Sequence, residues 1–504
     1  MSISTPTLVV FIVYLLGMLA IGAWTYKKTD TIADFFLGGR QMNSWVTAMS
    51  AQASDMSGWL LLAMPGAIYV TGINGLWMGI GLAVGTYLNW QFVATRLRRY
   101  TEINHSITIS AYLENRFRDK SKLLRVISAV MTLTFFLFYT ASGFLGSAKL
   151  FEATFNMNFD VALFAGALVV VGYTFLGGFL AVSLTDFVQG VLMFLTLLII
   201  PFVLFGMLGG FGSAMDAVAQ VNPDLLDITK TVKLTEGGEW ITKSAAISTI
   251  GTISLLAWGV GYFGQPHILV RFMGIRSARD IPAARFIGVT WVVLSLLGAG
   301  FVGLLGIAYF STPLADSETV LIQLAQTLLN PWVAGIVIAA IFAAIMSTVD
   351  SQLLVSSSAL AEDFYKSIIR KNASDAELVW VSRLTVLAIT IAAVLLARNA
   401  KESVMGMVSY AWAGFGSAFG PVILLSLFWK RMTRNGALAG MITGGVTVIL
   451  WQNVKVLEST GLYELVPGFI LGLVAIVVVS LLDKKPAEEI MQEFERAKRP
   501  LPNE

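Results

Sequence analysis

Thirteen long apolar segments set the first constraint on this chain of 504 residues. A helix needs about 20 apolar residues to cross the roughly 30 Å hydrocarbon core of a bilayer. Only 13% of the residues are charged, which is about half the share found in soluble domains. The chain therefore predicts one all-α polytopic membrane domain over residues 1–504. Its spans are expected near 6–26, 44–70, 73–95, 124–150, 160–182, 186–210, 246–268, 286–311, 331–361, 378–398, 403–429, 435–454 and 464–482.

The distribution of lysine and arginine indicates the orientation of these spans. With the N-terminus outside, 27 of the 34 basic residues fall in the inner connections or the tail, among them Arg271. This bias predicts an outer N-terminus, an inner C-terminus and an odd number of spans. The polar connection near 211–245 is expected outside, and the charged tail 483–504 is expected inside as a short helix or a disordered end.

Two predicted spans contain helix-breaking sequence near their middle. The second span has "SDMSGW" around Asp55, and the seventh has "WGVGYFGQPHIL", with three glycines before Pro266. Each begins a set of five spans, 44–210 and 246–429, and because five is odd the two sets must run in opposite directions. Paired interruptions in inverted halves point to a transporter binding site. Unwinding frees backbone carbonyls for a cation and amide groups for an anion.

The ninth span supplies hydroxyl groups. Its sequence "MSTVDSQLLVSSS" places Ser347 and Ser351 on one helical face, with Thr348 and Asp350 on either side. Hydroxyl and carbonyl oxygens are the ligands that a hard cation prefers. This span is therefore expected to face the interrupted ones.

The motifs "AQASDMSGWLL", "WGVGYFGQPHI", "MSTVDSQLLVSSS", "YAWAGFGSAFGP" and "RMTRNGALAGM" closely resemble the sodium/solute symporter family, and within it the bacterial sodium/proline symporters. The resemblance covers essentially the whole chain. It implies a leucine-transporter-type fold, with inverted repeats 44–210 and 246–429 and extra helices at both ends. It also implies sodium-coupled uptake of L-proline by alternating access across the bacterial inner membrane. We expect no enzymatic activity, no cofactor besides sodium as coupling ion and no nucleic-acid partner, and a monomer is expected to suffice.

The resemblance also implies site residues, position by position. Sodium is expected between the second and ninth spans, at Ala53, Asp55, Met56, Ala344, Ser347 and Thr348. Proline is expected near Ser57, Gly58, Trp59, Tyr139, Trp258, Tyr262 and Pro266. Aromatic faces suit the secondary ammonium and the ring of proline, and a broken helix end suits its carboxylate.

Asp55 is interpreted as a ligand of sodium or as its close electrostatic partner. The alternative is that Asp55 is a structural anchor at the helix break. Four residues are candidates for a second ion site or for coupling. They are Asp186, at the predicted start of the sixth span, Asp350, Ser351 and Arg40. Asp350 could instead pair with an arginine or lie solvated at a cytoplasmic cavity. Arg40 could simply be one of the inner loop arginines.

Other functions remain open at this point. A related symporter could carry another solute, such as pantothenate or a sugar, and protons could replace sodium. A channel would need a continuous polar pore, whereas the polar residues cluster around one site. A sensor would need a signalling domain, and a hydrolase finds no support because neither His105 nor His267 lies in a nucleophile or metal motif.

Overall fold

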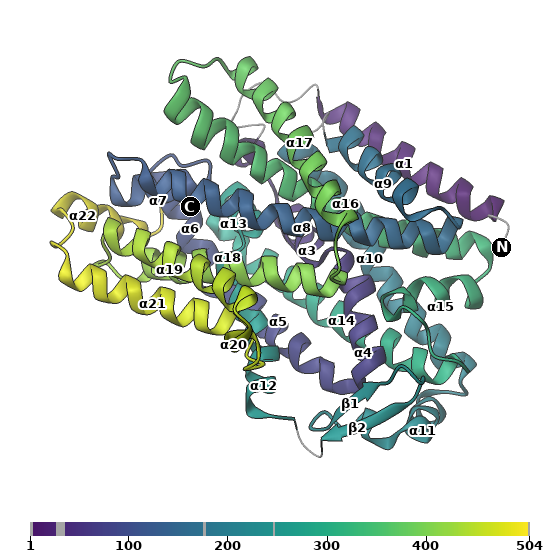
Figure 1. Ribbon diagram of the computed structural model, residues 1–504. Helices are drawn as coiled ribbons and strands as arrows, with labels where there is room; N and C mark the ends of the chain where they lie inside the picture. Colours follow the sequence, from purple (N-terminus) through teal and green to yellow (C-terminus); the bar gives the residue numbers. More distant parts are fainter. Residues whose placement is uncertain (1–3, 27–35, 175–177, 245–246, 502–504) are drawn as a thin grey trace.

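The computed structural model describes residues 4–26, 36–174, 178–244 and 247–501 (Figure 1). It is almost entirely helical, and η denotes a short 3-10 or π-helical stretch. The first elements are α1 (Thr5–Tyr26), η1 (Gly38–Arg40), α3 (Ser44–Gly58), η2 (Trp59–Ala63), α4 (Met64–Thr71), η3 (Gly72–Gly75), α5 (Leu76–Leu88), η4 (Asn89–Ala94), α6 (Thr95–Ile103), α7 (Ile109–Phe117), α8 (Leu123–Phe155), α9 (Phe159–Thr174) and α10 (Phe179–Met207).

The middle of the chain holds α11 (Phe211–Val221), η5 (Pro223–Leu226), β1 (Thr231–Leu234) and β2 (Trp240–Ser244). The remaining elements are α12 (Thr249–Leu256), η6 (Ala257–Gly264), α13 (Pro266–Gly274), η7 (Ala278–Asp280), α14 (Ile281–Tyr309), η8 (Ser317–Thr319), α15 (Val320–Leu328), α16 (Pro331–Ser358), η9 (Ala359–Ile369), α17 (Asp375–Arg398), α18 (Val404–Phe428), α19 (Arg434–Asn453), α20 (Lys455–Glu458), α21 (Leu465–Leu482) and α22 (Glu488–Ala497).

Helical structure occupies each of the predicted apolar ranges. Within the residues that the structure describes, nine helical segments are long and apolar enough to cross a membrane. Several helices extend beyond their predicted ends, and two of these differences bear on the site. The sixth segment begins at Phe179 rather than near 186, and the seventh continues through α13 to Gly274. The extension of the seventh segment brings Arg271 into the bundle, where the sequence did not place it because an apolar-run search ends a span where charged residues begin. The extension of the sixth segment places Asp186 inside the helix instead of at its start.

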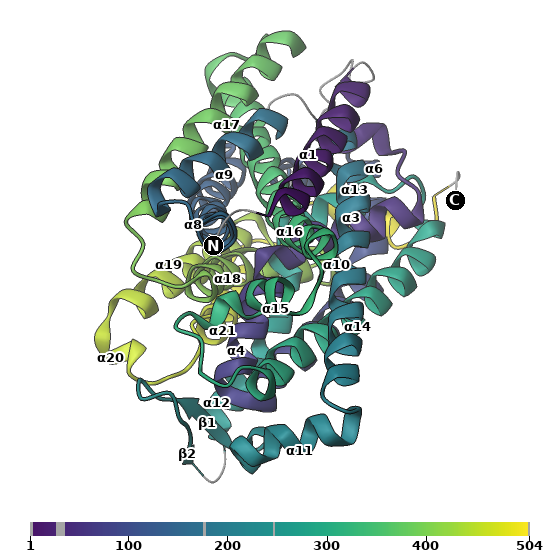
Figure 2. The same ribbon diagram turned by 90° about the vertical axis from the view of Figure 1, so that its right-hand side faces the viewer.

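The expectation of a purely α-helical chain was wrong in the polar connection after α10. There β1 and β2 pair as an antiparallel hairpin, which lies beside α11 at the bottom of both views (Figures 1 and 2). Trp240 anchors the hairpin, because its Nε1–H donates to the Tyr69 carbonyl at 2.7 Å and its ring packs edge-on against Tyr69. This connection thus covers one end of the interrupted second segment.

Helix α16 lies near the centre of the molecule in both views (Figure 2) and packs against α1, α3, α8 and α10. Its start is set by Asn330, whose side chain accepts the N–H groups of Trp332 and Val333, and by Pro331 at the first helical position. The alanine-rich run before Ser347 is buried, since small residues let neighbouring helices approach closely. The hydroxyl-bearing part of α16 is therefore placed deep in the bundle.

Helix α5 and the 3-10 stretch η6 touch backbone to backbone. A Cβ on Gly85 would lie 2.1 Å from the Gly259 carbonyl oxygen, and one on Gly259 would lie 2.0 Å from the Gly81 carbonyl oxygen. No rotamer relieves such a clash, because the obstructing atoms belong to the backbone. These glycines bring the interrupted seventh segment directly against α5.

We expect Gly85→Val to destabilise the protein by about 1–3 kcal/mol, because the side chain forces α5 and η6 apart. A lower melting temperature in detergent, followed by tryptophan fluorescence, measures the effect. The matched control is Gly17→Val in α1, where an added Cβ meets no atom within 4 Å. Equal melting temperatures for the two variants would contradict the prediction.

The charged tail forms a helix, α22, which packs against α6. Phe494 is 1% exposed, and the Arg116 guanidinium lies over its ring at 5.1 Å. Arg118 pairs with Glu493 at 3.3 Å; burial raises the pKa of the Glu493 carboxyl, and Arg118 opposes that shift. Of the two expectations for the tail, the short helix is confirmed over Glu488–Ala497.

Candidate functional site

The second segment is interrupted between α3 and η2, inside the motif around Asp55. Ser57 has φ 49° and ψ −174°, a backbone conformation that costs a non-glycine residue of order 1–3 kcal/mol. Its Oγ accepts the N–H of Trp59 at 3.0 Å, which satisfies one donor freed by the break. After it, the chain continues as a π-helical turn. Strain of this kind is typical of functional sites.

Two hydroxyls of α16 meet the carbonyl of Ala53 just before this break. Ser347 donates to the Ala53 oxygen at 2.8 Å and Thr348 donates to it at 3.4 Å. The same hydroxyls lie 3.1 and 3.2 Å from the Ala344 oxygen. Four of the six residues predicted for sodium thus bring their oxygens together. A hydroxyl that donates one hydrogen bond keeps lone pairs for a cation.

Asp55 connects three segments at the break. Its carboxylate accepts a hydrogen bond from the Tyr262 hydroxyl at 2.6 Å, and its backbone carbonyl accepts one from the Tyr139 hydroxyl at 3.2 Å. The residue is 4% exposed. A carboxylate buried at this depth marks a functional site by default, and here it joins α3 to both η6 and α8.

A small cavity opens beside Asp55. Five of its nine lining residues are aromatic, and the full set is Asp55, Met56, Trp59, Leu82, Tyr139, Trp258, Tyr262, Val408 and Trp412. The Trp59 and Trp258 rings stack at 5.6 Å, and Tyr262 meets Trp412 edge-on at 5.0 Å. Aromatic faces next to a carboxylate suit an organic ammonium group.

A second small cavity shares Trp59 and Tyr139 with the first. Its lining includes Ser57, Gly58 and Thr348, so it touches both the break and the hydroxyl pair of α16. Six of the seven residues predicted near the substrate thus line one cavity or the other.

Pro266 is the predicted substrate residue that the structure does not place there. It begins α13 and lines a different cavity, together with Thr108, Phe179 and Asp363. Pro266 fits the first turn of a helix because its ring restricts φ and its missing N–H is not needed there. Its position at the break is therefore accounted for by local structure.

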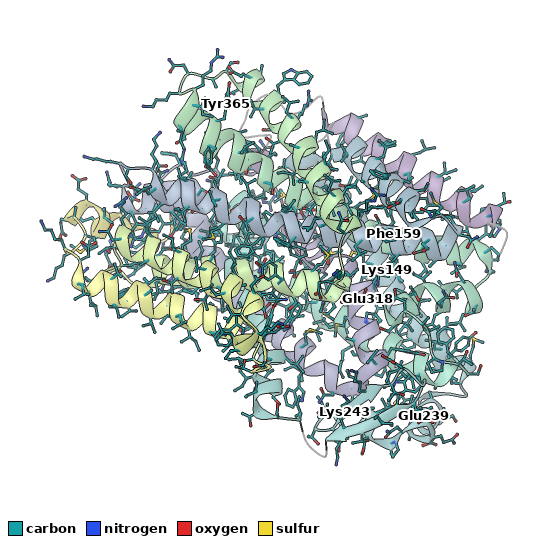
Figure 3. The ribbon with its side chains drawn as sticks, in the orientation of Figure 1. Lys149, Phe159, Glu239, Lys243, Glu318 and Tyr365 are labelled. Carbon is teal, nitrogen blue, oxygen red and sulfur yellow. The ribbon has the colours of Figure 1, made fainter. Side chains whose placement is uncertain are left out.

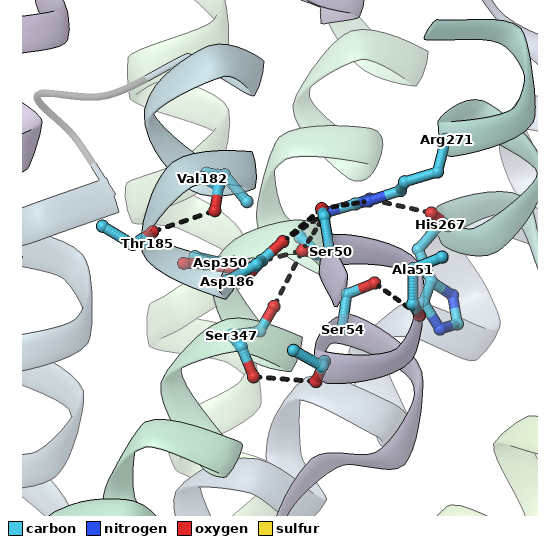
Figure 4. Close-up of polar contacts among 12 residues, drawn as sticks. Ser50, Ala51, Ser54, Val182, Thr185, Asp186, His267, Arg271, Ser347 and Asp350 are labelled. Atoms are coloured by element: carbon cyan, nitrogen blue, oxygen red, sulfur yellow. Dashed lines mark hydrogen bonds and ion pairs between the residues drawn. The ribbon is translucent and has the colours of Figure 1, made fainter. Parts of the chain in front are cut away.

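A second polar cluster surrounds Arg271 in α13 (Figure 4). The guanidinium donates to Asp186 at 3.1 Å, to the Ser351 hydroxyl at 2.6 Å and to the Ser50 hydroxyl at 3.1 Å. Ser50 in turn donates to Asp186 at 2.6 Å. Arg271 and Asp186 are both 0% exposed. We call this set of four residues the Arg271 cluster; it joins α3, α10, α13 and α16.

The Arg271 cluster corrects three expectations. Arg271 is not in an inner connection, because α13 continues past it. Asp186 lies well inside α10 rather than at its start. Asp350 is 0% exposed and accepts a hydrogen bond from Ser351 at 3.2 Å, so it does not lie solvated at a cavity.

A charged cluster lies where α8 meets the start of α18 (Figure 3). Lys149 donates to Glu318 at 2.6 Å and to Asp316 at 2.8 Å. The Glu318 carboxylate also accepts the N–H groups of Val404 and Met405, the free donors at the start of α18. Because Trp59 Nε1–H lies 3.2 Å from the Met405 sulfur, this cluster adjoins the aromatic cavity.

The chain matches the Sodium:solute symporter family over residues 35–444. It belongs to this family. It is 49% identical over 505 residues to the sodium/proline symporter of Escherichia coli (strain K12), covering 99% of this chain and 97% of the relative. It is 50% identical over 481 residues to the high-affinity proline transporter PutP of Bacillus subtilis (strain 168), covering 95% and 98%.

A solved structure of a Na+-coupled sialic acid symporter, in a substrate-bound outward-open state, has a TM-score of 0.80 to this chain. The two chains are 20% identical, and the match covers 96% of this chain and 99% of the other. This likeness shows the fold, which is that of a mostly helical, polytopic membrane protein.

In this family member, Arg40 lies on η1 and is held by backbone carbonyls. Its guanidinium donates to the oxygens of Thr101, Ser106 and Met273 at 2.8–3.1 Å. Burial, with Arg98 nearby, lowers the pKa of Arg40 to about 10, so it stays charged at neutral pH. These contacts tie the segment before α3 to the ends of α6 and α13.

Sequence reasoning missed three residues of these sites in this symporter-family chain. Arg271 was counted as a loop cation, because it follows an apolar run and no local pattern indicates its partner Asp186. Trp412 stands in the quoted motif "YAWAGFGSAFGP" but was given no role. Glu318 follows a polar connection, and no local pattern indicates that it caps a helix 86 residues further on.

Proposed function

We propose that this protein couples inward sodium flow to the uptake of L-proline by alternating access. The observation that carries this proposal is the convergence of the Ala53 carbonyl with the Ser347 and Thr348 hydroxyls at a strained break, directly beside an aromatic cavity that contains Asp55. The full-length likeness to sodium/proline symporters names the same ion and solute.

Sodium is proposed to bind between α3 and α16. Its ligands would be oxygens of Ala53, Met56, Ala344, Ser347 and Thr348, with Asp55 as a further ligand or as the neighbouring charge. Sodium prefers hard oxygen ligands of this kind. The hydroxyl-to-carbonyl contacts already hold most of these oxygens close together.

Proline is proposed to bind in the aromatic cavity. Its ammonium and ring would face Trp59, Trp258 and Tyr262, and its carboxylate would lie toward the helix break at Ser57 and Gly58, where backbone donors are available. A sugar would bring many hydroxyl groups into a lining that is more than half aromatic and would leave them unpaired at a cost. The cavity therefore favours proline over a sugar.

The proposed topology follows the distribution of basic residues. Thirteen spans would cross the bacterial inner membrane with the N-terminus outside and α22 inside, and residues 44–210 and 246–429 would form two inverted five-helix repeats. The interrupted segments α3–η2–α4 and α12–η6–α13 would each begin a repeat, as in transporters with a central site. Asp186, Asp350 and Ser351 remain candidates for a coupling role through Arg271.

One sodium ion is energetically sufficient. Moving one charge across about 100 mV is worth about 2.3 kcal/mol, and a tenfold sodium gradient adds about 1.4 kcal/mol. Together they support an accumulation of neutral proline of roughly 500-fold.

The test is uptake of radiolabelled L-proline into proteoliposomes that contain the purified protein. An inward sodium gradient is expected to drive accumulation at fixed pH, whereas an equal potassium gradient is not. A third arm with a proton gradient and no sodium distinguishes proton coupling. Equal uptake in sodium and potassium would reject sodium coupling, and sodium-driven uptake of pantothenate but not of proline would reject the substrate.

A further inference from the structure

The connection between α19 and α21, residues 454–464, reaches the wall of the aromatic cavity. The Tyr463 ring stacks on the Trp258 ring with centroids 5.5 Å apart and an interplanar angle of 18°. Trp258 also stacks on Trp59 at 5.6 Å and 27°. The indole of Trp258 is therefore held between the broken second segment and a part of the chain that lies beyond both proposed repeats.

Tyr463 is itself held by three helices. Its hydroxyl donates to the Ser409 carbonyl of α18 at 2.8 Å, and its N–H donates to the Ser254 hydroxyl of α12 at 3.0 Å. The preceding residue, Leu462, accepts the Trp451 Nε1–H of α19 at 3.0 Å. With 9% of its surface exposed, the Tyr463 ring has little freedom to move.

The Trp258 indole depends on such support. It projects from η6, where Gly259 and Gly261 on the same short stretch carry no side chain that could pack beside it. Trp412 donates its Nε1–H to the Trp258 carbonyl at 2.8 Å, which holds the backbone of Trp258. The orientation of the indole is set by its ring contacts, and Tyr463 provides the most nearly parallel of them.

We propose that Tyr463 is a positioning residue for proline binding, which holds the Trp258 indole so that its face meets the substrate. Tyr463 is not among the lining residues of the cavity, so it acts through Trp258. The inference rests on the proposed function. It assigns part of the substrate affinity to the helices that follow the second repeat.

The experiment compares Tyr463→Ala and Tyr463→Phe with the wild-type protein in sodium-driven proline uptake. Tyr463→Ala removes one aromatic pair and frees the indole, so the KM for proline is expected to rise about 3- to 10-fold. Tyr463→Phe keeps the ring, and its KM is expected to stay within about twofold of wild type. The maximal rate and the half-saturating sodium concentration are expected to stay nearly unchanged in both, since Ser347 and Thr348 lie on α16.

The matched control is Tyr410→Ala. Tyr410 lies next to Ser409 on α18, but its ring packs against Phe138 and Phe135. The KM of the Tyr410→Ala variant for proline is therefore expected to equal that of the wild-type protein. An unchanged KM in Tyr463→Ala, an equal loss in Tyr463→Phe, or a matching rise in Tyr410→Ala would each overturn the inference. A wild-type protein that fails to accumulate proline would overturn the proposed function instead.

Discussion

Alanine in place of Asp55 is expected to abolish sodium-driven proline uptake, and Thr348→Ala is expected to weaken the dependence on sodium sharply. Thr348 contributes one oxygen to the group around the Ala53 carbonyl, and an interaction with a charge is worth about 1.5–3 kcal/mol. The half-saturating sodium concentration should therefore rise about 10- to 100-fold in Thr348→Ala. Initial rates of proline uptake, measured over a range of sodium concentrations, give this value directly.

Two companion variants separate the roles of Asp55. Tyr262→Phe removes only the hydroxyl that donates to the Asp55 carboxylate and is expected to keep sodium-driven transport with a weaker affinity for proline. Asp55→Asn keeps the size of the side chain and removes the charge, and it is expected to lose sodium dependence. Wild-type sodium dependence in Asp55→Asn would assign Asp55 to the anchoring role alone.

Asp186→Ala is expected to cost about 3–5 kcal/mol of stability, because it leaves the Arg271 guanidinium buried without its carboxylate. Both side chains are 0% exposed and lie 3.1 Å apart. The double variant Asp186→Asn with Arg271→Gln removes both charges and is expected to recover much of that loss. Thermal unfolding of the purified proteins measures the effect, and proline uptake by the double variant then reports whether the pair has a role in transport.

An exposed ion pair in the same protein provides the control. Arg398 and Asp160 lie 3.0 Å apart with side chains 51% and 44% exposed, and Asp160→Asn is expected to change stability by about 1 kcal/mol or less. If Asp186→Ala lowered the stability no more than Asp160→Asn does, the buried pair would not be structurally important. If the double variant were less stable than Asp186→Ala, the two charges would not be each other's main partners.

The broad architecture could be predicted because it depends on local sequence. The lengths of the apolar runs located the long apolar helices. The small and hydroxyl-bearing residues around Ser57 located the first helix break. The meeting of Ala53 with Ser347 and Thr348 was expected only from the resemblance to the family, since nothing local joins positions 294 residues apart.

The Arg271 cluster and the hairpin could not be predicted in the same way. An arginine that follows an apolar run has the same appearance in a cytoplasmic loop and in a buried ion pair, and its partner Asp186 lies 85 residues earlier. Trp412 was given no role, because its contacts with Trp258 and Tyr262 join segments about 150 residues apart. Strands β1 and β2 are short, and Trp240 finds its partner Tyr69 in a distant segment.

Two contacts of the C-terminal region have a consequence for biosynthesis. Tyr463 meets Trp258, and Lys498 at the end of α22 accepts a hydrogen bond from Arg99 across 399 residues. Chains emerge from the ribosome N-terminus first, so residues 44–429 are translated before either contact can form. The nascent protein therefore passes through a stage in which all lining residues of the aromatic cavity have been made, while Tyr463, which stacks on Trp258, has not.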